Sequence, residues 1–355
     1  MSQASVPMAM SLNRGVFGTE QSVSPLLSML SGHIDRLPHH LGIENGGAPW
    51  EAWHEALYRP LEDFLGRSGK SFRANFVSLC WKLAGGHGNL PAQIPLFVEL
   101  LHAGSLIVDD IEDSAQMRRG APALHHLCGM PKALNAGNWL YFWPQTILAG
   151  MELDPEVELR IHRWIAQTLS RCHHGQALDL AIRVFEWDQL HVASMVETST
   201  RLKSGALFEL AAAIGAIHAK AQTSCEKALV RFGGDLGLAL QMYDDLSGLV
   251  NDSRMDKAQE DLIQARLTWP WAWLALHVDQ LEYTRLRGLA RSVYERDAPF
   301  HELRDALIKS LPDDVFLHPR NLLQSAFNDV RPHVRSVAAL QSLNDEIKRL
   351  ESSYV

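Results

Sequence analysis

The chain has 355 residues, of which 46% are hydrophobic and 21% charged, the composition of a folded globular protein and not of a disordered one. Its formal net charge of −8 argues against a nucleic-acid-binding protein, although individual arginines can still bind phosphate. The four cysteines (Cys80, Cys128, Cys172 and Cys225) form no CxxC pair, which is typical of reduced thiols in the cytoplasm. No apolar run is long enough to span a bilayer, so we expect no transmembrane segment and a cytoplasmic location.

The N-terminal stretch differs in composition from the rest of the chain. Residues 1–45 are rich in Ser, Met, Gly and Pro and lack sustained periodicity, which predicts a loose extension. From Trp50 onward apolar residues recur at helical spacing, and no alternation of period two is convincing. Glycine and proline predict breaks between helices, among them Pro144 and the Gly233–Gly234 pair. Residues 46–355 are therefore predicted to form one all-α domain, a single large helical bundle.

An apolar run over residues 100–108 ends in a cluster of acidic residues. Asp109 and Asp113 lie one helical turn apart, so their carboxylates converge on one face. Carboxylates crowded beside an apolar surface repel each other and lose hydration, and a divalent cation relieves both costs. A site that offers few oxygen ligands and leaves room for water and phosphate favours Mg²⁺. Arg118 and Arg119 follow, and arginine binds phosphate through two parallel hydrogen bonds. This combination fits an apolar chain that carries a diphosphate.

A second acidic stretch lies far downstream. Gln241, Asp244, Gly248 and Asp252 fall at i, i+3, i+7 and i+11, which places them on a single helical stripe. Two acidic helices that face each other across a bundle would bind a metal–diphosphate cluster from both sides. For either stretch alone, a solvated charged face is the alternative interpretation.

Basic residues complete the predicted site. Lys70 and Arg73 share one face at a predicted helix start, where free N–H groups also favour phosphate. His102 lies two turns before the first acidic cluster, on the same stripe. Lys203 and Arg266 are further candidates. Each of these residues alone is equally consistent with a surface charge, but together they match a pattern.

That pattern resembles the trans-isoprenyl diphosphate synthase family, most closely the geranylgeranyl diphosphate synthases of the eukaryotic type. The resemblance covers residues 65–275, with the aspartate-rich motif 109–113 intact and further matches at 135–140, 175–180 and 203–205. It implies an isoprenoid synthase fold of the class I type around a central prenyl-chain cavity. It also implies a homodimer that couples isopentenyl diphosphate with an allylic prenyl diphosphate, using about three Mg²⁺ ions as cofactor.

The resemblance assigns roles residue by residue. The implied metal ligands are Asp109, Asp113 and Asp244. The implied catalytic residues are Asp109, Asp110, Asp113, Arg118, Lys203, Gln241 and Asp244. The implied substrate-binding residues are Lys70, Arg73, His102, Arg118, Arg119, Lys203, Ser204, Gln241 and Arg266. Among the latter, the group that holds isopentenyl diphosphate is Lys70, Arg73, His102 and Arg119, and Arg118 matches the clamp on the allylic diphosphate.

Three positions depart from the family pattern. Gly248 stands where Asp or Asn is usual and has no ligating atom, which puts the metal affinity of the second motif in question. Arg266 replaces a lysine, which exchanges a point charge for a planar guanidinium. Ser204 replaces a threonine, a mild change.

The residues just before the first acidic cluster predict the length of the product. Gly104 and Ser105 are small where family members that stop at fifteen carbons often carry a bulky aromatic residue, and Leu101 one turn earlier is only aliphatic. We therefore expect the growing chain to extend past these three residues. The expected product is longer than fifteen carbons, with geranylgeranyl diphosphate of twenty carbons as the preferred assignment.

Two alternatives remain open at this point. A class I terpene cyclase or irregular terpene synthase on the same scaffold is favoured by Gly248 and by the ten tryptophans, whose faces can stabilise cations, although core packing explains tryptophans equally simply. A cyclase has no second diphosphate to bind, so the set of Lys70, Arg73, His102 and Arg119 argues against it. A non-catalytic regulatory subunit is the other alternative, in which Gly248 would mark a decayed site.

Overall fold

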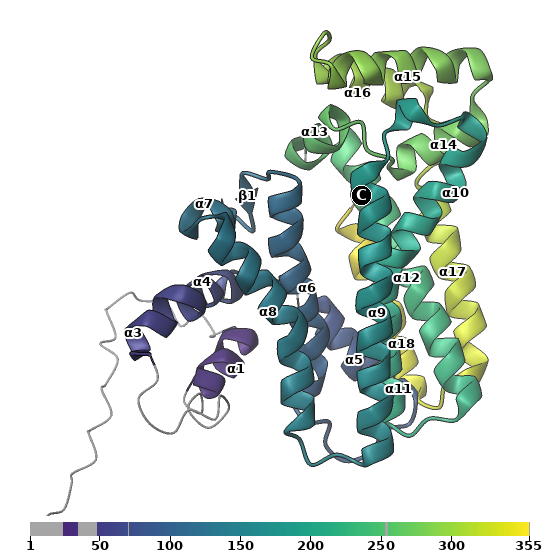
Figure 1. Ribbon diagram of the computed structural model, residues 1–355. Coiled ribbons are helices and arrows are strands. Elements are labelled where there is room, and N and C mark those ends of the chain that lie inside the picture. Colours follow the sequence, from purple (N-terminus) through teal and green to yellow (C-terminus); the bar gives the residue numbers. More distant parts are fainter. Residues whose placement is uncertain (1–23, 35–47, 70, 253–254, 355) are drawn as a thin grey trace, which may run out of the picture.

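The structure is a computed structural model that describes residues 24–34, 48–69, 71–252 and 255–354 (Figure 1). The described chain is helical almost throughout, with a single two-stranded hairpin, so the predicted all-α class is confirmed. None of the described helices is long and apolar enough to cross a membrane.

The helices and strands follow each other with short connections. The first half of the chain contains α1 (Pro25–Ile34), α3 (Trp50–Trp53), the π-helical turn η1 (His54–Tyr58), α4 (Arg59–Gly66), α5 (Phe72–Leu83), α6 (Gln93–Glu112), β1 (Met117–Arg118), β2 (Ala121–Pro122), α7 (Leu124–Cys128), α8 (Met130–Ala149) and α9 (Pro155–Ala181). The second half contains the 3₁₀ turn η2 (Val184–Glu186), α10 (Gln189–Thr200), the π-helical turn η3 (Arg201–Gly205), α11 (Ala206–His218), α12 (Thr223–Val250), α13 (Met255–Ile263), α14 (Trp269–His277), α15 (Gln280–Tyr294), α16 (Phe300–Ser310), α17 (Leu317–Val330), the 3₁₀ turn η5 (Arg331–His333) and α18 (Val337–Ser352).

Helices α5, α6, α9, α11 and α12 form the centre of the bundle (Figure 1). Eleven of the 13 residues of α11 are buried, as expected for a helix that is apolar on all sides. Helix α9 is amphipathic instead and buries Val157, Ile161 and Ile165 at helical spacing. The C-terminal ends of α6, α9 and α12 lie at the same end of the bundle (Figure 1), where Asp109 contacts Gln176 of α9 and Asp113 contacts Arg266.

Glycines allow α12 to approach its neighbours closely. A Cβ atom at Gly233 would lie 2.5 Å from the carbonyl oxygen of Phe208 in α11, and one at Gly237 would lie 2.7 Å from the carbonyl oxygen of Ser204 in η3. The predicted break at Gly233–Gly234 is therefore wrong, because these glycines serve helix packing within a continuous α12. The predicted break at Pro144 is also wrong, since this proline is buried inside α8.

The N-terminal stretch contains a helix where a loose extension was predicted. In α1, Leu26 and Leu30 lie one turn apart and are buried against α4 and α6. The two leucines form an apolar face, which the overall Ser- and Gly-rich composition of the stretch did not indicate. The prediction of a loose stretch is therefore wrong for residues 25–34. Residues 1–23 and 35–45 of the predicted extension lie outside the described residues.

Candidate active site

The β1–β2 hairpin positions the first arginine of the site. Its two-residue turn consists of Arg119 and Gly120, both with positive φ (52° and 76°), as in the type I′ turn that matches the twist of a hairpin. The hairpin holds Arg118 against α6, where its Nε donates to Oδ1 of Asp110 at 2.6 Å. The side chain of Asp110 is fully buried, and burial raises its pKa although Arg118 opposes the shift. The structure therefore places Asp110 behind the site, where it orients Arg118.

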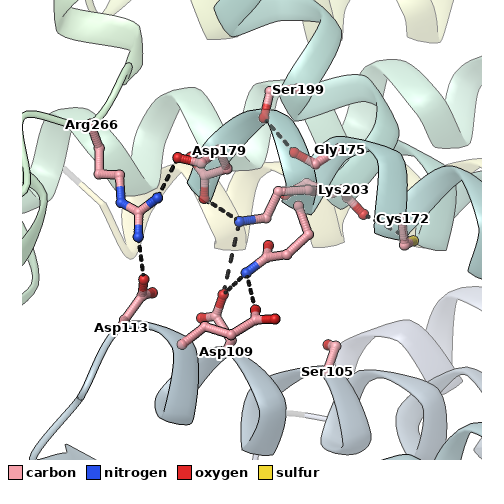
Figure 2. A network of polar contacts seen from close by, with 12 residues as sticks. Ser105, Asp109, Asp113, Cys172, Gly175, Asp179, Ser199, Lys203 and Arg266 are labelled. Carbon is pink, nitrogen blue, oxygen red and sulfur yellow. Dashed lines mark hydrogen bonds and ion pairs between the residues drawn. The ribbon is translucent and has the colours of Figure 1, made fainter. Parts of the chain in front are cut away.

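Asp109 faces α9 and is surrounded by donors (Figure 2). The amide of Gln176 donates to its Oδ1 at 3.0 Å and also to Glu112 at 2.7 Å, which links α6 to α9. Lys203 Nζ lies 3.9 Å from Oδ1 and Arg118 Nη2 lies 3.8 Å from Oδ2. The predicted partners Arg118 and Lys203 are thus brought to this carboxylate from different elements.

Asp113 and Asp179 hold two cations between α6 and α9 (Figure 2). Arg266 donates from Nη2 to Oδ1 of Asp113 at 2.7 Å and from Nη1 to the carbonyl oxygen of Asp179, while Lys203 pairs with the Asp179 carboxylate. Burial and the neighbouring Asp109 raise the pKa of Asp113 to about 6, although Arg266 opposes the shift. Burial lowers the pKa of Lys203, but the carboxylates of Asp179 and Asp109 outweigh it, so the net shift is upward.

Helix ends add to the negative charge of this region. Asp109 lies in the last turn of α6 and Asp179 in the last turn of α9, and neither last turn carries a basic residue. The carbonyl ends of helices bear partial negative charge, so acidic side chains there are destabilised and cations are favoured. Lys203 and Arg266 supply that positive charge in this structure.

A close contact between α9 and η3 places Lys203. A Cβ atom at Gly175 would lie 2.8 Å from Cβ of Leu202 and 2.9 Å from Cγ of Lys203, so only glycine permits this approach. The hydroxyl of Ser199 donates to the Gly175 carbonyl at 3.3 Å, and the thiol of Cys172 donates to the Lys203 carbonyl at 3.7 Å (Figure 2). The 175–180 motif therefore has a physical purpose, which is to bring η3 within reach of the acidic cluster.

The side chains predicted to hold isopentenyl diphosphate also lie near one another, namely Arg73, His102 and Arg119. Lys70, the fourth member of this set, lies outside the described residues. Arg73 and His102 are half-buried, but Arg73 Nε and His102 Nδ1 are buried atoms and have no hydrogen-bond partner among the described residues. Burial lowers the pKa of Arg73, and burial together with the nearby guanidiniums of Arg73 and Arg119 lowers that of His102 well below its ordinary value. His102 is therefore a neutral hydrogen-bonding group beside two arginines.

Glu99 counterbalances these arginines and was not predicted. Its side chain is 6% exposed, and its carboxylate accepts from the backbone N–H of Ala74, in the first turn of α5, at 3.1 Å. Burial lowers the pKa values of Arg73 and Arg119, and Glu99 is the largest charge that opposes this shift in each. Its position one turn before His102 could have indicated that it lies in the site. A single glutamate in an apolar run, however, gave no reason to select it as a functional residue.

The second acidic stretch is shorter than predicted. Helix α12 ends at Val250, so Asp252 does not continue the stripe; it is 84% exposed and pairs with Arg304 of α16 at 2.7 Å. A Cβ atom at Gly248 would lie 3.7 Å from Cβ of Ala258, so this position faces α13. Asp244 and Gly248 line a cavity of about 20 Å³, room for roughly one water molecule. Asp245 and Asp261 also line this cavity, and neither was predicted to act there.

The three residues proposed to set chain length differ in their surroundings. A Cβ atom at Gly104 would lie 2.8 Å from the Gly137 carbonyl oxygen, so Gly104 faces α8 at a close helix crossing and does not line a channel. Leu101 is buried in the main core. Ser105 is half-buried, its hydroxyl donates to the His102 carbonyl at 2.9 Å, and it projects to the same side of α6 as Asp109 (Figure 2).

Comparison with known proteins assigns this arrangement to a family. Residues 54–303 match the sequence profile of the polyprenyl synthetases, which is more than half of the chain. The chain belongs to the polyprenyl synthetase family. It is 29% identical over 215 residues to a geranylgeranyl pyrophosphate synthase of Geoglobus acetivorans, covering 60% of this chain and 66% of that protein. It is 34% identical over 194 residues to a geranylfarnesyl diphosphate synthase of Aeropyrum pernix, covering 53% and 59%.

Solved structures agree with the family assignment. The crystal structure of a geranylgeranyl pyrophosphate synthetase from Pyrococcus horikoshii superimposes with a TM-score of 0.71 at 25% identity, covering 92% of this chain and 98% of that one. The predicted isoprenoid synthase fold is thereby confirmed, whereas the central prenyl-chain cavity stays a prediction. The sequence alignments to the first two relatives found, by contrast, span 66% and 62% of their lengths.

The side chains of this polyprenyl synthetase suit a divalent metal ion in their chemistry. Asp109, Asp113 and Asp244 offer only oxygen ligands, as Mg²⁺ prefers. Burial, and after it the negative charge of Asp109, raises the pKa of Asp113, and a bound cation would oppose both effects. Among the described residues, however, no three metal-ligating side chains converge closely enough to bind an ion unaided. Diphosphate oxygens would therefore have to complete the coordination.

Proposed function

We propose that this polyprenyl synthetase couples an allylic prenyl diphosphate head-to-tail with isopentenyl diphosphate. The observation that supports this most strongly is the presence of two separate cationic groups. Arg118, Lys203 and Arg266 lie at the acidic cluster, whereas Arg73 Nε and the ring nitrogen Nδ1 of His102 are buried and have no hydrogen-bond partner in the described part of the chain. Buried polar groups without a partner are costly, and a second diphosphate would satisfy them.

The chemistry follows from the positions of these groups. Mg²⁺ held by Asp109, Asp113 and Asp244 would make the allylic diphosphate a better leaving group. Arg118, Lys203 and Arg266 would neutralise the charge that develops on the departing diphosphate. Arg73, neutral His102 and Arg119 would hold isopentenyl diphosphate so that its double bond attacks the allylic cation. Burial strengthens each of these electrostatic contacts.

The decisive experiment is product analysis. The purified protein is incubated with Mg²⁺, isopentenyl diphosphate and each allylic primer in turn, and separately with single prenyl diphosphates. We expect prenyl diphosphates that are longer than the primer by five-carbon units. A hydrocarbon formed without isopentenyl diphosphate would favour the cyclase, and no product from any combination would favour a regulatory subunit.

Several of the tryptophans that could have stabilised a carbocation in a cyclase are buried in the hydrophobic cores instead. Trp143, Trp271 and Trp273 are each at most 2% exposed and pack in the two hydrophobic cores that flank the central one. Trp269 is 7% exposed and belongs to the same core as Trp271, and Trp139 stacks on Trp143. These five side chains therefore serve packing, which weakens the argument from tryptophans for a cyclase.

We propose geranylgeranyl diphosphate as the product. Relatives that carry the name geranylgeranyl pyrophosphate synthase, at about 29% identity, support this length. Ser105 supports it as well, because a small side chain on the Asp109 side of α6 leaves room for a chain to pass. Ser105→Phe is expected to shorten the main product by at least one five-carbon unit, measured by chromatography of the dephosphorylated products. An unchanged product would place the limit elsewhere.

We also propose that the protein is a homodimer through α7 and α8. Large apolar side chains are exposed there, with Leu127 at 51%, Met130 at 56% and Phe142 at 63%. Exposed apolar groups on two elements that contact each other favour association. Light scattering on wild type and on the Phe142→Glu variant tests this, and a wild-type monomer would contradict it.

A further inference from the structure

Asp245, the second residue of the downstream aspartate pair, is hydrogen-bonded through both carboxylate oxygens. Its Oδ1 accepts from Nε2 of Gln241 at 2.7 Å, and its Oδ2 accepts from the backbone N–H of Trp269 at 3.0 Å. Trp269 is the first residue of α14, and the capping residue Thr268 makes no side-chain capping bond. Asp245 therefore serves α14 as a cap from another helix, satisfying one of the N–H groups that every helix start leaves open.

The same contacts continue to the other side of the site. The hydroxyl of Ser204 donates to Oε1 of Gln241 at 2.8 Å, so both ends of the Gln241 amide are hydrogen-bonded. Ser204 follows Lys203 directly, and Trp269 comes three residues after Arg266. Three hydrogen bonds in series, from Ser204 to Gln241 to Asp245 to Trp269, thus connect η3, α12 and α14. The first residue of the series follows Lys203 and the last lies close to Arg266, the two cations that pair with Asp179 and Asp113.

The upstream aspartate pair is arranged in the same way. Asp109 faces α9, whereas Asp110 is buried and accepts from Arg118. Adjacent residues on a helix point about 100° apart, so a pair of aspartates on one helix serves two directions. In both pairs the second carboxylate bonds to the segment that carries an arginine.

We propose that Asp245 is a positioning residue, which sets the place of Arg266 through the start of α14 and does not bind the metal ion. The proposal rests on the proposed function in one respect, namely that Arg266 binds the diphosphate. Arg266 is 6% exposed and bonded to Asp113 and to the Asp179 carbonyl, so a small shift of its segment changes its reach. A metal ion at Asp245 would compete with these two hydrogen bonds for the lone pairs of the carboxylate.

The first test measures backbone hydrogen exchange over residues 264–273 in the substrate-free protein. Asp245→Ala removes the acceptor of the Trp269 N–H, so exchange in this segment is expected to become faster. Asp244→Ala is the matched control and is expected to leave it unchanged. Equal exchange in Asp245→Ala and wild type would overturn the proposal, whether or not the enzyme makes any product.

The second test separates positioning from metal binding. Calorimetry measures the affinity for inorganic pyrophosphate at saturating Mg²⁺, and a Mg²⁺ titration at fixed pyrophosphate gives the half-saturating metal concentration. Asp245→Ala is expected to weaken pyrophosphate binding about tenfold at an unchanged Mg²⁺ midpoint, whereas Asp244→Ala is expected to raise the midpoint. Restoration of Asp245→Ala by excess Mg²⁺ would show that Asp245 is a metal ligand.

A double-mutant cycle identifies the residue through which Asp245 acts. In an Arg266→Gln background, Asp245→Ala is expected to weaken pyrophosphate binding less than twofold, because the group it positions is already gone. A full tenfold loss in both backgrounds would contradict the proposal. Should Asp245→Ala fail to fold, Asp245→Asn keeps the shape of the side chain and one acceptor oxygen, and it is expected to show the same pattern at reduced size. Since these assays use pyrophosphate, a failure of isopentenyl diphosphate coupling would be seen separately.

Discussion

The two acidic helices differ in how far their charges are balanced before any ligand binds. On α6, Asp110 pairs with Arg118, Asp113 pairs with Arg266, and Asp109 accepts from Gln176. On α12, Gly248 carries no ligating group, and Asp252 lies beyond the helix end, where it pairs with Arg304 at the surface.

The difference indicates a division of labour. Three elements converge on the α6 cluster, so its geometry is fixed by several independent contacts. Helix α12 offers Asp244 to the metal and uses Asp245 and Gln241 to join neighbouring elements. We therefore expect changes on α6 to affect the chemical step most, and changes at the end of α12 to affect it least. Four experiments test this ranking.

The largest effect is expected for Asp109→Ala. The variant removes a proposed metal ligand and leaves Lys203 without one of its carboxylates, so kcat should fall by roughly 10²-fold or more. Steady-state turnover at saturating Mg²⁺ measures the loss. Asp252→Ala, which removes an exposed aspartate just beyond the end of α12, is the control and should keep near-normal turnover. Comparable losses in the two variants would contradict the special role of Asp109.

The next effect concerns the second cationic group. Arg73→Ala should raise the KM for isopentenyl diphosphate by about tenfold or more, because a buried charge-assisted contact is lost, while the KM for the allylic substrate changes less than twofold. Arg59→Ala, which removes an exposed arginine, is the control. An equal rise in both KM values would mean that Arg73 does not distinguish the two diphosphates.

A smaller effect is expected in the pH dependence of stability without metal. The pKa of Asp113 is about 6 in the folded protein against an ordinary value of 3.8, so between these pH values the folded protein holds a proton that the unfolded chain has released. Stability should therefore fall as pH rises through this window, by roughly 1–3 kcal/mol. Asp113→Asn lacks this contribution. The Tm of the variant minus that of wild type should thus increase between pH 4 and pH 7, and a constant difference would contradict the assignment.

The smallest effect is expected for Gly248→Asp. A Cβ atom here has ordinary contacts with Ala258, and the position lines the same cavity as Asp244, so we expect the new carboxylate to add an oxygen ligand near Asp244. The half-saturating Mg²⁺ concentration should fall by roughly two- to fivefold, and the Tm in EDTA should fall slightly because another carboxylate joins a crowded region. Gly248→Ala controls for the loss of glycine. A weaker metal response would show that position 248 points away from the metal.

The sequence predicted the site best where a pattern depends on local spacing. Asp109 and Asp113 share a face because they are four residues apart, and this holds wherever the helix is placed. The roles of Gln176, Asp179 and Asp245 depend on which helix packs alongside, and spacing within one element carries no such information. Both Gln176 and Asp179 lie inside a stretch that matches the family, and the resemblance placed Gln176 near the reacting chain but gave no role to Asp179.

Glycines account for two of the errors. Gly233, Gly234 and Gly104 were interpreted as a chain break and an open channel, since glycine disfavours helices and leaves space. In the structure Gly233 and Gly104 lie inside helices at points where another backbone approaches within contact distance. A close approach depends on two elements, so one sequence alone cannot distinguish it from a turn or a void.

The pairing of Lys203 and Arg266 with acidic side chains has a thermodynamic consequence. Arg266 is buried and Lys203 is half-buried, and both already have acidic partners, so binding of Mg²⁺ and pyrophosphate exchanges one set of partners for another within the site. Little additional surface is removed from solvent, and the heat-capacity change of pyrophosphate binding should therefore be close to zero. A prenyl tail buries apolar surface as well. The difference between the heat-capacity changes of binding for a prenyl diphosphate and for pyrophosphate therefore reports the burial of the tail alone.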